Sequence, residues 1–187
     1  MLAKDKVMPA LDDHARRFIA LSPFLCLASS AADGRADVSP RGDPPGFVAV
    51  LDERTLLIPE RKGNRRADTM LNIVENPAVG LIFFVPGIDE TLRINGRATI
   101  VDDPALLAPL AVDGKAPALG VRVAVDEVFL HCAKALIRSR LWDPERRIER
   151  ADFPTLGRII VDQLAPDDMT VEAAERIVAD NYKTELY

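Results

Sequence analysis

Cysteine and histidine are scarce in this 187-residue sequence, and their scarcity excludes several classes of protein. The two cysteines, Cys26 and Cys132, stand far apart and form no CxxC pair, which is too few thiols for a disulfide scaffold or a structural zinc site. We therefore expect a cytoplasmic protein without a metal. The motifs HExxH, GxSxG, GxxxxGK and GxGxxG are absent, so the sequence gives no support to zinc-protease, hydrolase, P-loop or Rossmann classes.

Long apolar runs are missing too. No stretch reaches the roughly 18 uninterrupted apolar residues of a membrane-spanning helix, and the first six residues lack the apolar core of a signal peptide. The 24 basic and 29 acidic side chains give a net charge of −5, so nucleic acid or an acidic membrane would repel the chain as a whole. Any anion that binds must therefore find a local basic cluster.

The composition is otherwise that of a globular protein, with 48% hydrophobic and 28% charged residues, and the length fits a single domain over residues 1–187. Helical spacing predicts helices at residues 11–21, 65–75, 104–110, 133–141, 156–164 and 171–178. Strand patterns cover residues 24–30, 36–40, 47–51, 55–59, 78–85, 90–101 and 121–132. Several connections are too short for parallel crossovers. We therefore predict a closed antiparallel barrel of about six strands (core about 24–132) with peripheral helices and a helical region at about 133–187.

Two of the expected strands have informative patterns. Residues 78–85 form a continuous apolar run, which predicts a strand buried on both faces. Residues 90–101 alternate strictly, which places four polar residues on one face: Thr91, Arg93, Asn95 and Arg97. Two arginines on one sheet face repel each other unless something negative lies between them. This polar row is either an exposed sheet face or the wall of a site for a ligand or a partner chain.

The most informative segment is basic. Residues 61–66 (RKGNRR) carry four cations at the junction of an expected strand and an expected helix with Asn64 as its N-cap. Arginines in a first helical turn oppose the helix dipole, which favours anions there. A bound dianion such as a phosphate would resolve this conflict, since backbone N–H groups and guanidinium groups can hold it together. The alternative is a solvated basic turn at the surface.

Two further segments are candidates for a site. Residues 39–46 (SPRGDPPG) end a strand in a constrained loop, which is either a close approach of the main chain to a flat ligand or a corner of the sheet. A helix starting at Ala133 would place Lys134 and Arg138 on one face and lead to Trp142, the only tryptophan.

With these segments in this order, the sequence resembles the pyridoxamine 5′-phosphate oxidase-like, FMN-binding split β-barrel superfamily, and within it a subgroup of FMN-dependent flavoproteins. Four motifs over roughly residues 24–144 carry the resemblance: SPRGD at 39–43, KGNRRA at 62–67 with Asn76-Pro77, ETLRINGRA at 90–98 and CAKALIRSRLWDP at 132–144. The resemblance implies a six-stranded antiparallel split β-barrel and a homodimer with two FMN sites at the subunit interface.

The resemblance also assigns roles to residues. It implies that Arg65 and Arg66, together with Asn64 and Lys62, hold the FMN phosphate. The backbone of residues 38–42 and of Ile58 and Pro59 would line the flavin ring, and Thr91 would meet the ring from a neighbouring strand. Residues near Trp142 would come from the partner subunit. The full set of expected cofactor-binding residues is Ser39, Pro40, Arg41, Gly42, Ile58, Pro59, Lys62, Asn64, Arg65, Arg66, Thr91, Arg93, Lys134, Arg138 and Trp142.

The implied function is that of an FMN-dependent oxidoreductase with no essential acid–base side chain, because the flavin carries the redox chemistry and the protein positions it. The C-terminal substrate-binding pattern of pyridoxamine phosphate oxidases is not evident, so we expect a different small organic substrate, with NAD(P)H as a candidate. The alternative is a non-catalytic protein on the same barrel that stores or senses a flavin, a deazaflavin or haem. Neither nucleic acid nor a membrane is an expected partner.

Overall fold

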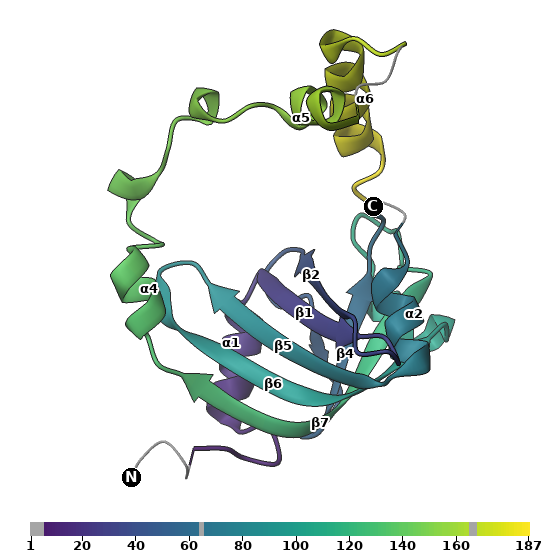
Figure 1. Ribbon diagram of the computed structural model, residues 1–187. Helices are drawn as coiled ribbons and strands as arrows, with labels where there is room; N and C mark the ends of the chain where they lie inside the picture. Colours follow the sequence, from purple (N-terminus) through teal and green to yellow (C-terminus); the bar gives the residue numbers. More distant parts are fainter. Residues whose placement is uncertain (1–5, 64–65, 165–167) are drawn as a thin grey trace. The chain divides into compact units, whose positions relative to one another are not determined.

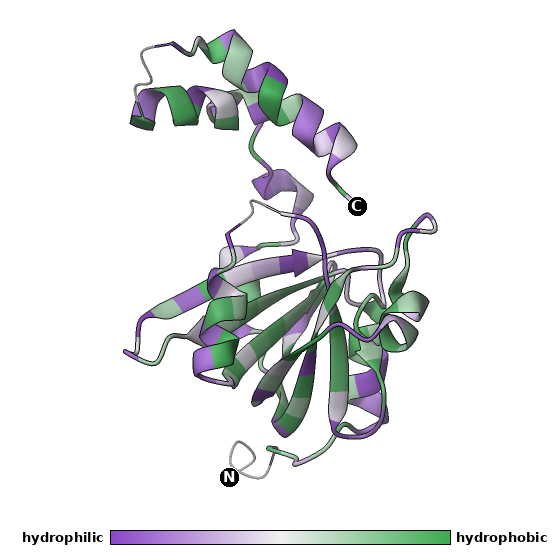
Figure 2. Ribbon diagram, turned by 90° about the vertical axis from the view of Figure 1, so that its right-hand side faces the viewer, coloured by the Kyte–Doolittle hydropathy of each residue, from purple (hydrophilic) through white to green (hydrophobic). Residues whose placement is uncertain are grey.

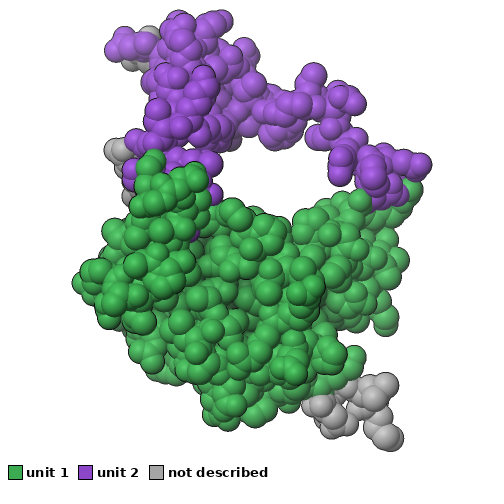
Figure 3. All heavy atoms as spheres, turned by 180° about the vertical axis from the view of Figure 1, so that it is seen from behind, with its two compact units in different colours: residues 1–60, 66–142 green, residues 61–65, 143–187 purple. Residues whose placement is uncertain are grey.

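The computed structural model describes residues 6–63, 66–164 and 168–187, and the contacts group the chain into two compact units (Figure 3). Unit 1 comprises residues 1–60 and 66–142, and unit 2 comprises residues 61–65 and 143–187. The single domain over residues 1–187 stays a prediction.

Unit 1 contains the sheet (Figure 1). Its strands are β1 (Phe24–Ser30), β2 (Ala36–Gly42), β3 (Ala49–Val50), β4 (Thr55–Glu60), β5 (Ala78–Val85), β6 (Ile88–Val101) and β7 (Leu119–His131). Its helices are α1 (Asp13–Leu21), α2 (Asp68–Glu75), α3 (Pro104–Leu107), the short 3-10 helix η1 (Ala108–Leu110) and α4 (Lys134–Ser139). Each element predicted in this part of the sequence is present. The bounds of β1, of β5 and of α3 with η1 are as predicted, and the other elements have shifted ends.

The strands form one antiparallel sheet in the order β2-β1-β5-β6-β7-β4-β3. The sheet has seven strands where we predicted a barrel of about six. The segment predicted as a strand at residues 47–51 is reduced to the two-residue β3. β2 lies at one end of this order and β4 beside the other end, yet Arg41 on β2 forms an ion pair with Glu60 on β4. The two ends of the sheet therefore approach each other. A curled antiparallel sheet with helices confirms the predicted fold class.

The inner face of the curled sheet shares one hydrophobic core with α1 and α2. Figure 2 shows that hydrophobic residues make up much of the strands. α1 begins behind Asp12, whose carboxylate accepts a hydrogen bond of 2.8 Å from the backbone N–H of Ala15, as an N-cap does. The most deeply buried sheet residues of this core include Leu25, Leu27, Phe83, Leu92 and Ile94.

β5 is buried on one face only, so the prediction of a strand with two buried faces is wrong. Leu81 and Phe83 point into the core, whereas Ile82 and Phe84 are half-buried on the outer face of the sheet. Both sets are apolar, and the periodicity of such a run carries no information about whether the second face has a cover.

β6 alternates as predicted over residues 92–99, whereas Thr91, which the pattern places with the outward residues, is buried. The partner strand β7 changes phase at a β-bulge. The register shifts between Asn95 and Gly96, and the buried positions of β7 move from the odd-numbered Val125 to the even-numbered Val128. The extra residue places Glu127 on the same outer face as Asn95. A Cβ atom at Gly96 would lie 2.2 Å from the carbonyl oxygen of Ala124, so the backbones approach closely here.

The described part of unit 2 contains η2 (Pro144–Arg146), η3 (Arg150–Asp152), α5 (Leu156–Leu164) and α6 (Val171–Thr184). The two predicted amphipathic helices are therefore present, and α6 extends beyond its predicted end. They pack against each other at Gly157, where a Cβ atom would lie 2.7 Å from the backbone nitrogen of Glu175. Among the described residues, no helix combines the length and the apolar character needed to cross a membrane.

Candidate functional site

β2 is the edge strand that carries the SPRG segment. Ser39 and Arg41 are half-buried on the inner face of the sheet, and Pro40 and Gly42 are exposed on its outer face. An edge strand presents backbone N–H and C=O groups that no neighbouring strand uses. The segment is thus a strand through Gly42, and a flat ligand can meet its free edge.

Arg41 and Glu60 form a shielded ion pair between β2 and β4. Arg41 Nη1 donates to Glu60 Oε2, and the side chains are 12% and 27% exposed. Burial raises the pKa of the Glu60 carboxyl, and the Arg41 guanidinium opposes that rise. The Nε–H of Arg41 is buried and has no hydrogen-bond partner within the described ranges of the chain. A donor left in that state costs about 1–3 kcal/mol, which a ligand oxygen would recover.

α2 is fastened to the β1–β2 hairpin by side-chain hydrogen bonds. Asn72 Nδ2 donates to Ser29 Oγ at 3.1 Å inside the core, and Thr69 Oγ1 donates to Asp37 Oδ2 at 3.0 Å. These bonds hold the start of α2 beside β2.

α2 begins at Asp68, with Ala67 as its N-cap, and not at residue 65 as predicted. Arg66 therefore precedes the helix, and the first turn contains an acidic residue, as the helix dipole favours. The predicted conflict between Arg66 and the dipole does not exist. Arg66 instead donates its Nε–H to Asp68 at 2.7 Å in an exposed ion pair, worth at most about 1 kcal/mol.

Residues 61–65 make up the rest of the basic segment. Asn64 and Arg65 lie outside the described residues. Lys62 is exposed, and the guanidinium carbon of Arg61 lies 5.4 Å from the centre of the Tyr187 ring within unit 2.

Three further predicted site residues lie in the sheet. Ile58 and Pro59 are buried on β4, so their side chains pack within unit 1 and only their backbone is suited to a ligand. Thr91 is only 3% exposed although it lies in the outer polar row. The indole Nε1–H of Trp142 donates to the carbonyl of Ile88 at 2.9 Å, which ties the end of α4 to the start of β6.

The outer face of the sheet carries an apolar patch. We define the outer patch as the outward residues of β1, β2 and β5 that pair directly with one another: Phe24, Cys26, Ala28, Val38, Pro40, Ile82 and Phe84. Val38 is 64% exposed. Burial raises the pKa of the Cys26 thiol, which keeps it protonated, so this thiol contributes apolar surface to the outer patch.

The polar row of β6 borders the outer patch. Arg93 pairs with Ile82 of β5 on one side, and its guanidinium carbon lies 5.1 Å from the centre of the Phe129 ring on the other. Asn95 Nδ2 donates to Glu127 Oε2 at 3.1 Å. The row thus has an aromatic ring and a carboxylate beside its charges, which the alternation of β6 alone did not predict.

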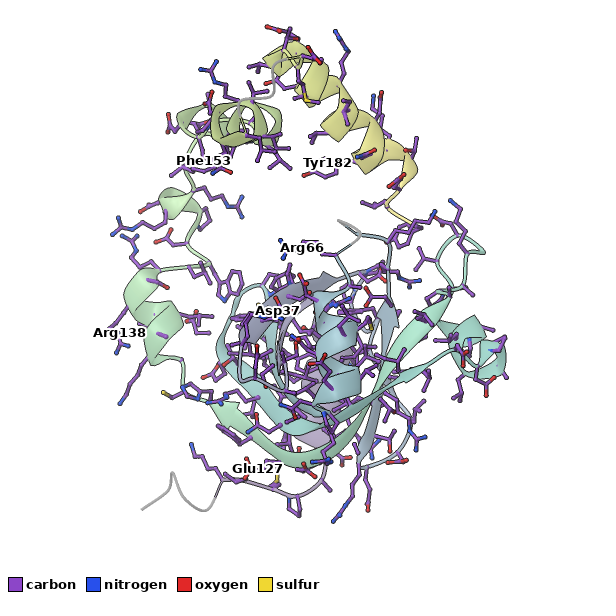
Figure 4. The ribbon with its side chains drawn as sticks, turned by 45° about the vertical axis from the view of Figure 1, so that its right-hand side comes forward. Asp37, Arg66, Glu127, Arg138, Phe153 and Tyr182 are labelled. Carbon is purple, nitrogen blue, oxygen red and sulfur yellow. The ribbon has the colours of Figure 1, made fainter. Side chains whose placement is uncertain are left out.

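Lys134 and Arg138 lie on α4 and are exposed. Figure 4 shows Arg138 well apart from Arg66 and Asp37, so the structure does not bring these cations together within one chain. No group of three or more metal-ligating side chains occurs in the described ranges.

Sequence reasoning missed Glu60, Asp37 and Asn72. The alternation could have indicated the first two, because it places Asp37 on the inner face with Arg41, and Glu60 on the inner face with Ile58. Opposite charges at inward positions of two strands make these residues candidates for ion pairs, but the alternation does not indicate which residue is the partner of which.

The fold and these residues define a curled antiparallel sheet with an edge strand, a buried unsatisfied donor and an apolar outer face. The family model of pyridoxamine 5′-phosphate oxidase matches residues 11–132, more than half of the chain, and the chain therefore belongs to this family. Its fold is that of flavin-binding proteins, oxidoreductases among them. A search of curated proteins found no match.

Solved structures share the fold at low sequence identity. HupZ of Group A Streptococcus is 17% identical, with 64% of this chain and 93% of that chain covered and a TM-score of 0.53. A candidate pyridoxamine 5′-phosphate oxidase from Lactobacillus delbrueckii is 23% identical (66% and 98% covered, TM-score 0.50). The conserved hypothetical protein Rv2991 from Mycobacterium tuberculosis is 16% identical (80% and 97% covered, TM-score 0.50).

Proposed function

We propose that the chain is a homodimeric, FMN-dependent oxidoreductase that acts on a small organic substrate. The observation that carries the proposal is the family match over residues 11–132, which includes the SPRG strand, the basic segment and the polar row. FMN supplies two-electron chemistry at its ring when bound, and the chain supplies position, shielding and charge.

The residues present fit the phosphate and the ring of FMN. A phosphate with close to two negative charges suits the basic segment, where Lys62, Asn64, Arg65 and Arg66 would hold it. The flat ring, with alternating acceptors and a donor along its pyrimidine edge, suits the free edge of β2. The buried Nε–H of Arg41 is a donor for which the described part of the chain offers no acceptor.

The outer patch supports a second copy of the chain at this site. β5 supplies apolar side chains to both of its faces, and one chain covers only the inner face. Exposed contiguous apolar surface is typical of interaction sites. Because Lys134 and Arg138 are separated from Arg66 within one chain, we place them, with Trp142, at the FMN site of the partner subunit.

The first experiment is titration of the purified protein with FMN. We expect quenching of FMN fluorescence and, at 100 times Kd, about 2.7 kcal/mol of stabilisation in thermal unfolding. Anaerobic addition of NADH or NADPH should bleach the flavin band if either is the electron donor. A colourless protein that neither quenches nor is stabilised by FMN would refute the proposal, and bound flavin that no reductant or substrate turns over would indicate a binding protein.

The phosphate site is tested with Arg65→Ala/Arg66→Ala, which we expect to release FMN. The matched control is Arg16→Ala/Arg17→Ala, which removes two adjacent arginines from α1. Wild-type affinity in the first variant would place the phosphate elsewhere.

The dimer is tested with Val38→Asp, which puts a charge into the outer patch. We expect monomers in analytical ultracentrifugation and weaker FMN binding. Val74→Asp on α2 is the control, since Val74 is 76% exposed and outside the patch. A dimeric Val38→Asp variant would contradict the proposed interface.

A further inference from the structure

The ion pair of Arg41 and Glu60 has a donor to spare. Glu60 engages Nη1 of Arg41, whereas the buried Nε–H has no partner among the described residues. Buried N–H groups in proteins are nearly always hydrogen-bonded. An unpaired one on an edge strand therefore indicates an acceptor from outside the part of the chain that the structure describes.

The charge of the pair restricts what that acceptor is. Arg41 already faces a carboxylate, so the pair as a whole is close to neutral and attracts a dianion weakly. Other carboxylates on this face are occupied differently, since Asp37 on the same strand accepts from Thr69. A neutral carbonyl oxygen suits the Nε–H better than a phosphate, whose charge the exposed cations of the basic segment match.

We propose that Arg41 donates its Nε–H to a carbonyl oxygen of the flavin ring, and that Glu60 is a positioning residue that orients Arg41 and offsets its charge. This inference rests on the proposed function. In this arrangement the charges of Arg41 and Glu60 set the relative affinity for oxidised and reduced FMN, because two-electron reduction leaves extra electron density on the ring. A positive charge nearby favours the reduced form, and a negative charge disfavours it.

The decisive experiment measures the reduction potential of bound FMN at pH 8 in variants of the pair. Glu60→Gln removes the negative charge and should shift the affinity ratio about tenfold toward reduced FMN, a rise of about 30 mV. Arg41→Gln should shift it about tenfold the other way. The double variant removes both charges and should return close to wild type. Asp37→Asn is the matched control, a carboxylate on the same strand face but outside the pair, and should leave the potential nearly unchanged.

Binding affinities for FMN and riboflavin show whether Arg41 contacts the ring carbonyl or the phosphate. Arg41→Lys keeps the charge but has no Nε–H donor of the guanidinium kind, and we expect it to weaken FMN and riboflavin binding by the same factor, about fivefold. Riboflavin lacks the phosphate, so a loss confined to FMN would assign Arg41 to the phosphate and overturn the inference. Unchanged affinity for both would mean that water satisfies Nε, which overturns it as well.

The potentials separate a specific role from a structural one. If the pair were merely structural, Glu60→Gln and Arg41→Gln would shift the reduction potential of bound FMN in the same direction. The double variant would then depart from the wild-type potential at least as much as either single variant. That result, or unchanged potentials with FMN still bound, would overturn the inference alone. Failure of the wild-type protein to bind FMN would overturn the proposed function and this inference with it.

Discussion

Among the glycines, Gly96 leaves the least room for an added Cβ atom. A Cβ atom there would lie 2.2 Å from the carbonyl oxygen of Ala124, whereas real Cβ atoms almost never come within 3.0 Å of a neighbouring, non-bonded heavy atom. β6 and β7 would have to separate by about 1 Å at the bulge. Overpacking of this kind destabilises a folded protein by about 1–3 kcal/mol. A weakened ladder hydrogen bond adds about 1 kcal/mol. We therefore expect Gly96→Ala to destabilise unit 1 by about 3 kcal/mol, which lowers Tm by about 6–12 °C for a chain of this size.

Urea and thermal unfolding followed by far-UV circular dichroism measure this loss. Gly80→Ala is the control, because Gly80 lies in the neighbouring strand β5 and its Cβ would meet Asn95 Oδ1 at an ordinary 3.5 Å. Alanine is less costly than glycine in a strand, so Gly80→Ala should be neutral or slightly stabilising. If Gly96→Ala unfolds like Gly80→Ala, the close backbone approach at the bulge is wrong, and with it the placement of Glu127 on the outer face.

Two further predictions concern α2 and the ion pair. Asn72→Ala and Ser29→Ala should each cost about 1–3 kcal/mol in urea unfolding, since each leaves the other polar group unpaired in the core, and the double variant should cost less than the sum; additive losses would mean that the two side chains do not interact. The folded-state pKa of Glu60 is raised above its ordinary value of 4.5 by burial, with Arg41 opposing. The folded protein therefore binds the proton of the Glu60 carboxyl more tightly than the unfolded chain does. The stability that this protonation contributes is complete below the unfolded pKa and is lost as pH rises through the folded pKa. Relative to the Glu60→Gln variant, the free energy of unfolding of the wild-type protein should fall as pH rises between the unfolded and the folded pKa of Glu60. Above that range the two plots of free energy against pH should be parallel. Plots that are parallel at every pH would refute the raised pKa of Glu60.

Local patterns in the sequence were sufficient for most of the fold. The alternation of Leu92 and Ile94 against Arg93 and Asn95 depends only on the two-residue repeat of a strand, and the structure confirms it. The start of α2 was misplaced because apolar spacing from residue 67 onward does not distinguish a helical residue from the turn before it. The structure starts the helix at Asp68, where the first turn gains a negative charge.

Long-range relations were beyond those patterns. The Arg41–Glu60 pair joins residues 19 apart in sequence and from opposite regions of the strand order, so no local window contains it. The bulge is equally invisible, because a single extra residue in β7 changes which side chains face outward without changing their identities. Of the candidate site, the sequence could therefore indicate which residues carry charge, but not which of those charges are already paired.

The wrong prediction for β5 is itself informative about function. A strand that faces solvent on one side normally alternates apolar with polar residues, because apolar side chains gain nothing from exposure. β5 does not alternate, and its outer residues Ile82 and Phe84 continue the surface that Phe24 and Val38 begin. Full burial of such side chains contributes about 1.5–3 kcal/mol each. The sequence of β5 thus suits a cover on both sides. In the proposed homodimer, a second copy with its own α4 cations would supply that cover and complete the proposed FMN site.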